Sequence, residues 1–209
     1  MRAMKIYDIS IPLRPGMIVY PDNAPASLRA VRRLPEASTN LSELTTGTHN
    51  GTHVDSPRHV KSGAAGSWPL EKLVGKCAVL DLSGIPFGKG IEEKDLRAER
   101  FRKGDVVLLK TRNSARGFAK FHPDFVFLAP GGMRLLKKRG AKAVGIDSVA
   151  VQKFHSGNQL VHRGLLLSGI PVFEGLDLKG VPGGRYEFFG LPLKMECDGV
   201  PARAILVKR

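Results

Sequence analysis

The segment HNGTHVDSPRHV, residues 49–60, contains three of the six histidines of the chain. His49 and His53 have the four-residue spacing of two metal ligands on one face of a helix. Gly51 lies between them and Pro57 follows, however, and both residue types interrupt helices. We therefore expect an extended segment at this point of the chain rather than a helix.

An extended segment aligns the ligand-type side chains of this stretch. His53 and Asp55 are two residues apart and so share one face of a strand, and a bend at Gly51 brings His49 towards them. A turn after Asp55 lets His59 approach from another side. Two imidazoles and a carboxylate suit zinc or manganese, and three protein ligands leave positions open for water. The segment therefore predicts a divalent metal site with a position free for catalysis.

Around this segment, short apolar runs and turn residues predict a mixed sheet with helices beside it. Strands are expected at 5–13, 28–34, 41–49, 76–83, 104–111, 141–147, 170–176, 185–197 and 202–208. Helices are expected at 91–101, 133–140 and 162–169. In the first of these helices Ile91, Leu96 and Phe101 are expected to face inward. Strands and helices that do not alternate strictly indicate an α/β or α+β domain on a mixed sheet.

Length and composition favour one domain that spans residues 1–209. A chain of 209 residues, of which 42% are hydrophobic, can bury a large core. It has no apolar run near the ~18 residues that a membrane span needs, and its first residues, MRAMKIYDIS, lack the apolar centre of a signal peptide. Its two cysteines, Cys77 and Cys197, suit a reducing compartment. We therefore expect a cytoplasmic protein without a membrane partner.

The net charge of +14 raises the question of a nucleic-acid partner. Lysine and arginine are spread along the chain, however, and the densest group, RLLKKRG at 134–140, is typical of the solvated face and C-terminal end of a helix. We expect no nucleic-acid binding, because the charge can equally attract small anions. The alternatives to an enzyme are, in order, a metal-binding protein without catalysis and a basic nucleic-acid-binding domain.

At the pattern H-x-G-T-H-x-D-x-P-x-H the sequence resembles the cyclase-like metal-dependent hydrolases, a family that includes bacterial kynurenine formamidase and isatin hydrolase. The resemblance continues at YDISIPL, GSWPLEKLVGKCAVLDLS, AKAVGIDSVAV and HRGLLLSGIPVFEGLDL. It implies a swivelling β/β/α fold, built on a mixed sheet or partial barrel with flanking helices. It also implies an arylformamidase-like hydrolase of small amides, acting on C–N bonds other than peptide bonds, that assembles as a homodimer or homotetramer.

The same resemblance implies roles for five ligand-type residues. His49, His53 and Asp55 would hold a first metal ion, and Asp55 could bridge to a second. His162 and Glu174 would complete the second position, with Glu174 also reaching the bridge. The resemblance therefore implies two divalent ions per subunit, zinc or manganese, as cofactors.

Outside the ligands, the resemblance concerns proton transfer and substrate binding. His59 would donate and accept protons while metal-activated water attacks the amide. His155 is the alternative to His162 as the ligand at this position, because it lies only seven residues earlier, in a loop. Tyr20 stands in a YPDN segment where the formamidases have the tryptophan of WPGD, which lines the substrate pocket. Tyrosine can still stack on a flat substrate, but it is smaller and carries a hydroxyl.

Overall fold

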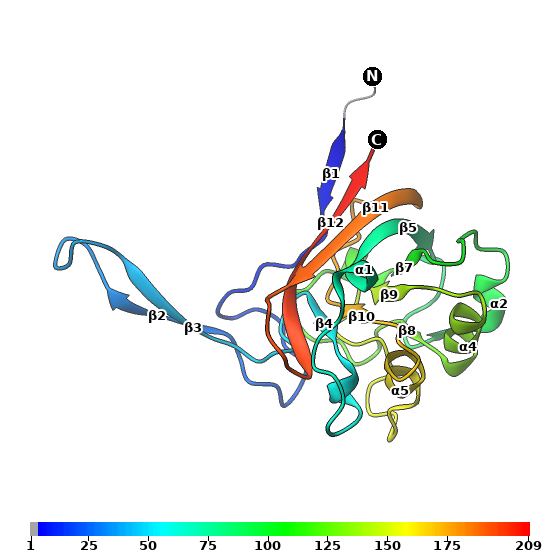
Figure 1. The fold of residues 1–209 in the computed structure, drawn as a ribbon, viewed down its shortest axis with the longest axis horizontal. Coiled ribbons are helices and arrows are strands. Elements are labelled where there is room, and N and C mark those ends of the chain that lie inside the picture. The colour runs from blue at the N-terminus through cyan, green and yellow to red at the C-terminus, as the bar shows by residue number, and fades with distance from the viewer. Residues whose placement is uncertain (1–3) are drawn as a thin grey trace.

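The computed structural model describes residues 4–209 and is built around an eight-stranded mixed sheet (Figure 1). The order of the strands is β1-β12-β11-β5-β7-β9-β10-β4, and β4 also pairs with β12. Seven of the eight strands therefore close into a ring, and β1 is attached to it only through β12. The predicted fold class, a mixed α/β sheet that closes as a partial barrel, is confirmed.

The twelve strands have these bounds: β1 Lys5–Asp8, β2 Ser27–Arg32, β3 Leu41–Thr45, β4 His53–Asp55, β5 Val74–Asp81, β6 Gly90–Ile91, β7 Val106–Lys110, β8 Phe127–Leu128, β9 Ala143–Ile146, β10 Val172–Glu174, β11 Gly184–Pro192 and β12 Gly199–Lys208. The helices are the 3₁₀ turn η1 Pro57–His59, α1 Leu70–Leu73, α2 Glu93–Leu96, α3 Asn113–Arg116, α4 Pro130–Lys138 and α5 Leu160–Leu166. None of the helices within residues 4–209 combines the length and the apolar character that crossing a membrane requires.

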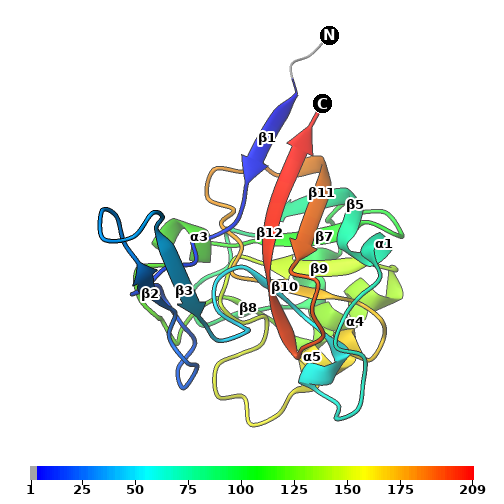
Figure 2. The same ribbon diagram turned by 60° about the vertical axis from the view of Figure 1, so that its left-hand side comes forward.

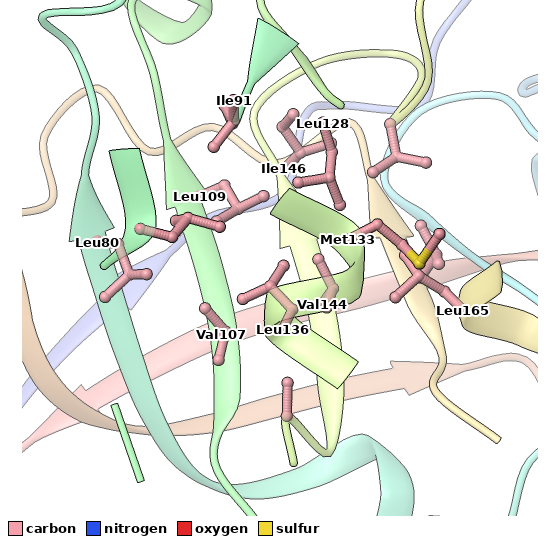
Figure 3. Close-up of a cluster of buried hydrophobic side chains, with 14 of the residues drawn as sticks. Leu80, Ile91, Val107, Leu109, Leu128, Met133, Leu136, Val144, Ile146 and Leu165 are labelled. Carbon is pink, nitrogen blue, oxygen red and sulfur yellow. The ribbon is translucent and has the colours of Figure 1, made fainter. Parts of the chain in front are cut away.

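The apolar runs of the sequence form the parallel centre of the sheet. Strands β5, β7, β9 and β10 are parallel neighbours, and both faces of each strand are covered, which explains why their sequences do not alternate. On β7, Val107 and Leu109 pack towards the helices, whereas Val106 and Leu108 point into the ring. Figure 3 shows Val107 and Leu109 beside Leu136 of α4.

The predicted helices at 133–140 and 162–169 are present as α4 and α5, but the helix predicted at 91–101 is wrong in extent. Only the single turn α2 is helical, and Ile91 belongs to β6. Arg139 explains the short helix, because its guanidinium donates to the backbone carbonyls of Leu96, Glu99 and Phe101. These carbonyls are thereby held by a side chain instead of by a continuing helix. The inward direction predicted for Ile91, Leu96 and Phe101 is confirmed, since all three are buried.

Strands β2 and β3 form a hairpin, here called the arm (Ser27–Thr45), that stands away from the ring (Figure 1). Every residue of β3 is exposed. Figure 2, in which the arm is turned towards the viewer, shows the long antiparallel pair of β11 and β12 in the ring. The arm is thus the only hairpin among the described residues that packs on no second layer of this chain, a condition in which two strands are marginally stable.

Candidate metal centre

The motif segment folds as its glycine and proline predict. Gly51 has a φ of +70°, a left-handed conformation that glycine adopts without strain, and the chain then enters β4. His53 and Asp55 are buried and share one face of this strand. Pro57 opens the 3₁₀ turn that ends at His59. The predictions of an extended segment, a bend and a turn are all confirmed.

Five ligand-type side chains meet where β4 lies beside β10. Asp55 Oδ1 is 3.0 Å from His49 Nδ1 and 3.3 Å from His53 Nε2. Glu174 faces His53 directly across the antiparallel β4–β10 pair, with Oε2 3.4 Å from Nε2. From α5, His162 Nε2 lies 3.2 Å from Glu174 Oε1 and 3.7 Å from Asp55 Oδ2. The structure therefore brings all five predicted ligands into one cluster.

The third histidine of the motif lies over this cluster. The ring centre of His59 is 4.5 Å from that of His49 and 5.2 Å from that of His162. Ring or carboxylate atoms of His49, Asp55 and His59 also come within 4.8 Å of one another, as do those of a second trio, His53, Asp55 and Glu174. His59 is half-buried at the edge of the group and makes no hydrogen bond to a carboxylate among the described residues.

Buried atoms without a hydrogen-bond partner test whether the cluster suits a cation. His53 Nε2 and both carboxylate oxygens of Asp55 are fully buried and have no partner in the described part of the chain. The nearest polar atoms lie within reach but at angles that make no hydrogen bond. Buried polar atoms are normally paired, and a lone-pair nitrogen beside two carboxylate oxygens is a donor set for a divalent metal. The residues present therefore fit a metal ion.

Several groups outside the motif orient the cluster. His53 Nδ1 donates to the carbonyl of Gly51 at 3.0 Å, which leaves Nε2 as the lone-pair nitrogen. Trp68 Nε1 donates to the backbone carbonyl of Asp55 at 2.7 Å. Glu174 Oε1 accepts from the backbone N–H of Val151 at 2.6 Å. Sequence reasoning missed these contacts, because the first depends on the rotamer of His53 and the other two join segments that only the folded chain brings together.

Asp198 is a further carboxylate that sequence reasoning missed. Its Oδ2 lies 2.9 Å from His49 Nε2. In the sequence Asp198 precedes Gly199, a pair typical of a turn, and nothing there connects it with the motif. The connection comes from the sheet, because Gly199 of β12 pairs with Asp55 of β4.

Opposite charges within the cluster shift its pKa values in opposite directions. Burial lowers the pKa of His53, but Asp55 and Glu174 outweigh burial and raise it to about 10. Burial would raise the pKa of Asp55, but His49 and His53 hold it well below its usual range. The pKa of His59 is lowered, chiefly because burial disfavours its charged form. His59 is therefore the neutral imidazole of the group.

The cluster opens into a cavity of about 580 Å³. His59 and His162 of the cluster line it, and so does Tyr20. Tyr20 makes edge-on contacts with Phe121 and Phe154, each with ring centres 5.6 Å apart. Asn23, Gln152, Lys153 and His155 complete much of the lining.

His155, the alternative to His162 as a metal ligand, is not part of the cluster. It lines the cavity and stacks on Phe154, with ring centres 3.9 Å apart. The nitrogen of His162 is the one that faces Glu174 and Asp55. Of these two histidines, His162 is therefore the one that belongs to the cluster.

A protein-family model described as "Putative cyclase" matches residues 7–153, more than half of the chain. The chain belongs to the cyclase family. Over 206 residues the chain is 32% identical to the kynurenine formamidase of Erythrobacter litoralis (strain HTCC2594). The matched region covers 97% of this chain and 93% of that relative. The resemblance seen in the motif is thereby confirmed.

Solved structures of similar proteins share the fold of this cyclase-family chain. The structure of a predicted metal-dependent hydrolase from Bacillus stearothermophilus is 33% identical and has a TM-score of 0.86, covering 99% of this chain and 100% of that chain. An isatin hydrolase bound to the product analogue thioisatinate has a TM-score of 0.85 at 17% identity, covering 98% of this chain and 92% of that chain. At that identity the second likeness concerns the fold alone.

Proposed function

We propose that this protein is a metal-dependent hydrolase of small amides, with formamides and cyclic amides as its substrate class. The observation that carries the proposal is the cluster of buried imidazoles and carboxylates at the wall of an open cavity. Three buried atoms of this cluster, His53 Nε2 and the two carboxylate oxygens of Asp55, have no hydrogen-bond partner among the described residues. Similarity to kynurenine formamidases over nearly the whole chain supports an amide as the substrate. A cavity that reaches the ligands favours catalysis over a metal site with a purely structural role.

We assign proton transfer to His59. A divalent cation in the cluster would supply hydroxide from water at neutral pH and stabilise negative charge on the amide oxygen. His59 lines the cavity, and its lowered pKa keeps the imidazole able to accept a proton. Once protonated, the same ring can deliver that proton to the departing nitrogen. Among the described residues of the cluster it is the imidazole that no carboxylate holds.

We propose two ions per subunit, zinc or manganese, because the two carboxylates each face two sides of the cluster. Asp55 turns Oδ1 to His49 and His53 and Oδ2 to His162. Glu174 turns Oε2 to His53 and Oε1 to His162. Carboxylates that present one oxygen to each side are suited to bridging two cations. His49, His53 and Asp55 would hold one ion, and His162 and Glu174 would complete the other.

We propose that Tyr20 binds the substrate through its ring. Phe121 and Phe154 hold this ring edge-on at the cavity wall. A tyrosine so placed offers one face for stacking on a flat group. A planar amide, cyclic or attached to an aromatic ring, suits this wall better than a flexible chain does.

The test of this function combines metal analysis with a substrate panel. Purified protein is stripped of metal, reloaded with zinc or manganese, and assayed on aryl formamides, cyclic amides and lactones. We expect hydrolysis of at least one amide by the loaded protein and none by the stripped protein. Metal binding without hydrolysis of any amide would leave a non-catalytic metal protein and overturn the assignment.

We also propose that the protein works as a homodimer or homotetramer in the cytoplasm, on small molecules. The exposed arm supports self-association, because an isolated hairpin gains stability when a second copy covers it. Free thiols at Cys77 and Cys197 support a reducing compartment. The spread of basic residues along the chain favours a small-molecule substrate over nucleic acid. The whole chain, residues 1–209, is proposed to be one domain, since a single sheet includes both β1 and β12.

A further inference from the structure

We infer that Asp198 is a positioning residue: it holds the ring of His49 so that Nδ1, and not Nε2, faces the metal. The inference depends on one part of the proposed function, namely that the cluster binds a metal ion. Asp198 is not a ligand in this arrangement, because the ring of His49 separates it from Asp55. Its carboxylate is 2.9 Å from His49 Nε2, while Nδ1 on the other side of the ring is 3.0 Å from Asp55 Oδ1.

The two motif histidines thus present opposite nitrogens to the cluster. His53 donates from Nδ1 to the carbonyl of Gly51 and presents Nε2. His49 donates from Nε2 to Asp198 and presents Nδ1. A neutral imidazole carries one N–H, so the partner of that N–H decides which nitrogen keeps the lone pair for a metal. A carboxylate is a stronger acceptor than a carbonyl and makes the bound histidine more basic.

Asp198 is itself held so that only one oxygen is turned to His49. Its Oδ1 accepts from Thr48 Oγ1 at 3.3 Å and from Cys197 Sγ at 2.8 Å, which leaves Oδ2 for the imidazole. The backbone is held as well, because Ser56 N donates to the carbonyl of Asp198 at 2.9 Å. Ser56 Oγ donates to the carbonyl of Cys197 at 2.6 Å. The position of the carboxylate is therefore determined by the end of β4, the strand that carries Asp55.

Gly199 restricts the ring of His49 as well, because it lies against the face of the ring. A Cβ at this position would lie 2.5 Å from Cε1 and 2.7 Å from Nδ1 of His49. The backbone of β12 therefore packs against the ring, and only glycine permits that approach. His49 is confined by the glycine on its face and by a carboxylate at each of its two nitrogens.

The test uses Asp198→Ala, Asp198→Asn and a matched control, Glu196→Gln. Glu196 is a carboxylate two residues away whose partner is Arg58 and not a histidine, so its variant removes the same charge from the same loop. Zinc is titrated into each metal-stripped protein by calorimetry with a competing chelator. We expect Asp198→Ala to weaken zinc binding by about 10- to 100-fold, the usual effect of losing a partner of a metal-bound histidine. We expect Asp198→Asn, which keeps an acceptor oxygen, to lose less, and Glu196→Gln to match the wild type.

Nitrogen-15 spectra of the histidine rings supply a readout that does not depend on activity. We expect His49 of the wild type to carry its proton on Nε2, both with zinc and in the metal-free protein at alkaline pH. In Asp198→Ala we expect a mixture of the two neutral forms. A wild-type ring protonated on Nδ1, or an Asp198→Ala variant that binds zinc within twofold of the wild type, would overturn the inference.

The two proposals fail in different ways. Thermal melting first establishes that each variant is folded, and Asp198→Asn, which preserves shape, serves if the alanine variant is not. If the wild type binds no zinc or manganese, the proposed function fails, yet the metal-free spectra still decide whether Asp198 orients His49. If all three variants lose affinity equally, the effect is one of charge in the loop, and the positioning role is wrong.

Discussion

At the scale of single residues, the environment of each imidazole separates the proposed ligands from the proposed proton carrier. Carboxylates lie within 3.5 Å of His49, His53 and His162, and they raise the pKa of each ring in spite of burial. His59 has no such partner, and burial lowers its pKa. A ring that stays neutral near pH 7 and lines the cavity can exchange protons with a substrate, whereas rings held by carboxylates are oriented for a cation.

Replacing His59 with alanine should therefore separate catalysis from metal binding. We expect the first metal to remain and amide hydrolysis to fall by about 10²–10⁴-fold, the usual contribution of a positioned acid or base. Turnover, metal content and thermal melting are measured on one preparation. His122→Ala, a histidine outside the cavity lining, is the control and should leave all three unchanged. Loss of metal would make His59 a ligand, and a normal rate with normal metal would remove it from the mechanism.

His53 is the histidine on which the first metal depends most, because it is fully buried and faces both carboxylates. We expect His53→Ala to lose the tightest metal site, since it removes the central nitrogen of the cluster. Elemental analysis after dialysis against a weak chelator measures the stoichiometry. A variant that keeps the wild-type amount of metal would contradict the ligand assignment.

The raised pKa values predict how metal affinity depends on pH. In the metal-free protein the pKa of His53 is raised from 6.5 to about 10, so the folded state binds a proton there that the unfolded chain has lost. This proton contributes stability below about pH 6.5, and the contribution is lost as the pH rises towards about 10. A cation must displace the same proton, so manganese affinity should rise with pH across this window.

Calorimetry in buffers of different ionisation enthalpy counts the protons released. We expect release of at least one proton per manganese ion near pH 7, together with a melting temperature that falls with pH when metal is absent. His122→Asn should keep both slopes, because His122 lies outside the cluster. An affinity that is constant with pH, with no proton released, would contradict the prediction.

At the scale of secondary-structure elements, the sequence predicts what depends on neighbours along the chain. The buried runs of β5 and β7, the bend at Gly51 and the turn at Pro57 follow from residue type alone. The short α2 does not, because Arg139, more than forty positions later in the chain than Leu96, accounts for it. The partial barrel was implied by the family resemblance, but local sequence patterns do not show which strand closes it, since β4 is only three residues long and pairs with both β10 and β12. Asp198 reaches the site through that closure, which explains why the motif did not reveal it.

Thr52 joins three segments that frame the motif, so its hydroxyl should matter for stability. It accepts from the backbone N–H of Ile11 at 2.9 Å and donates to the carbonyl of Gly175, just after β10. Thr52→Val keeps the shape but leaves both buried groups without this partner, which costs about 1–3 kcal/mol of unfolding free energy. Chemical denaturation measures the change. Thr45→Val, at an exposed site on the arm, is the control, and equal stability of the two variants would contradict the prediction.

At the scale of the whole molecule, exposed apolar side chains gather on two surfaces. Within residues 4–209, eight of the thirteen large hydrophobic residues that are exposed belong to the arm or to one groove beside α1. The groove is lined by Trp68, Leu70, Leu193 and Met195, among others, and continues into a second hollow that includes Leu44 at the base of the arm. A molecule that carries both a protruding apolar arm and an apolar groove can bury both when two copies pair symmetrically.

The arm therefore provides the test of self-association. Leu28 and Leu44 are directly opposite each other in the hairpin and are 52% and 49% exposed, so they form one apolar face. We expect the wild type to elute at the mass of a dimer or tetramer in size-exclusion chromatography with light scattering, because burying this face is favourable. Leu28→Glu and Leu44→Glu should shift the mass to that of a monomer by placing a charge in the interface. Leu160→Glu, at a leucine 50% exposed outside the arm and the groove, should leave the mass unchanged. A wild type that is monomeric at every concentration tested, or arm variants that keep the wild-type mass, would show that the exposed arm does not mediate assembly.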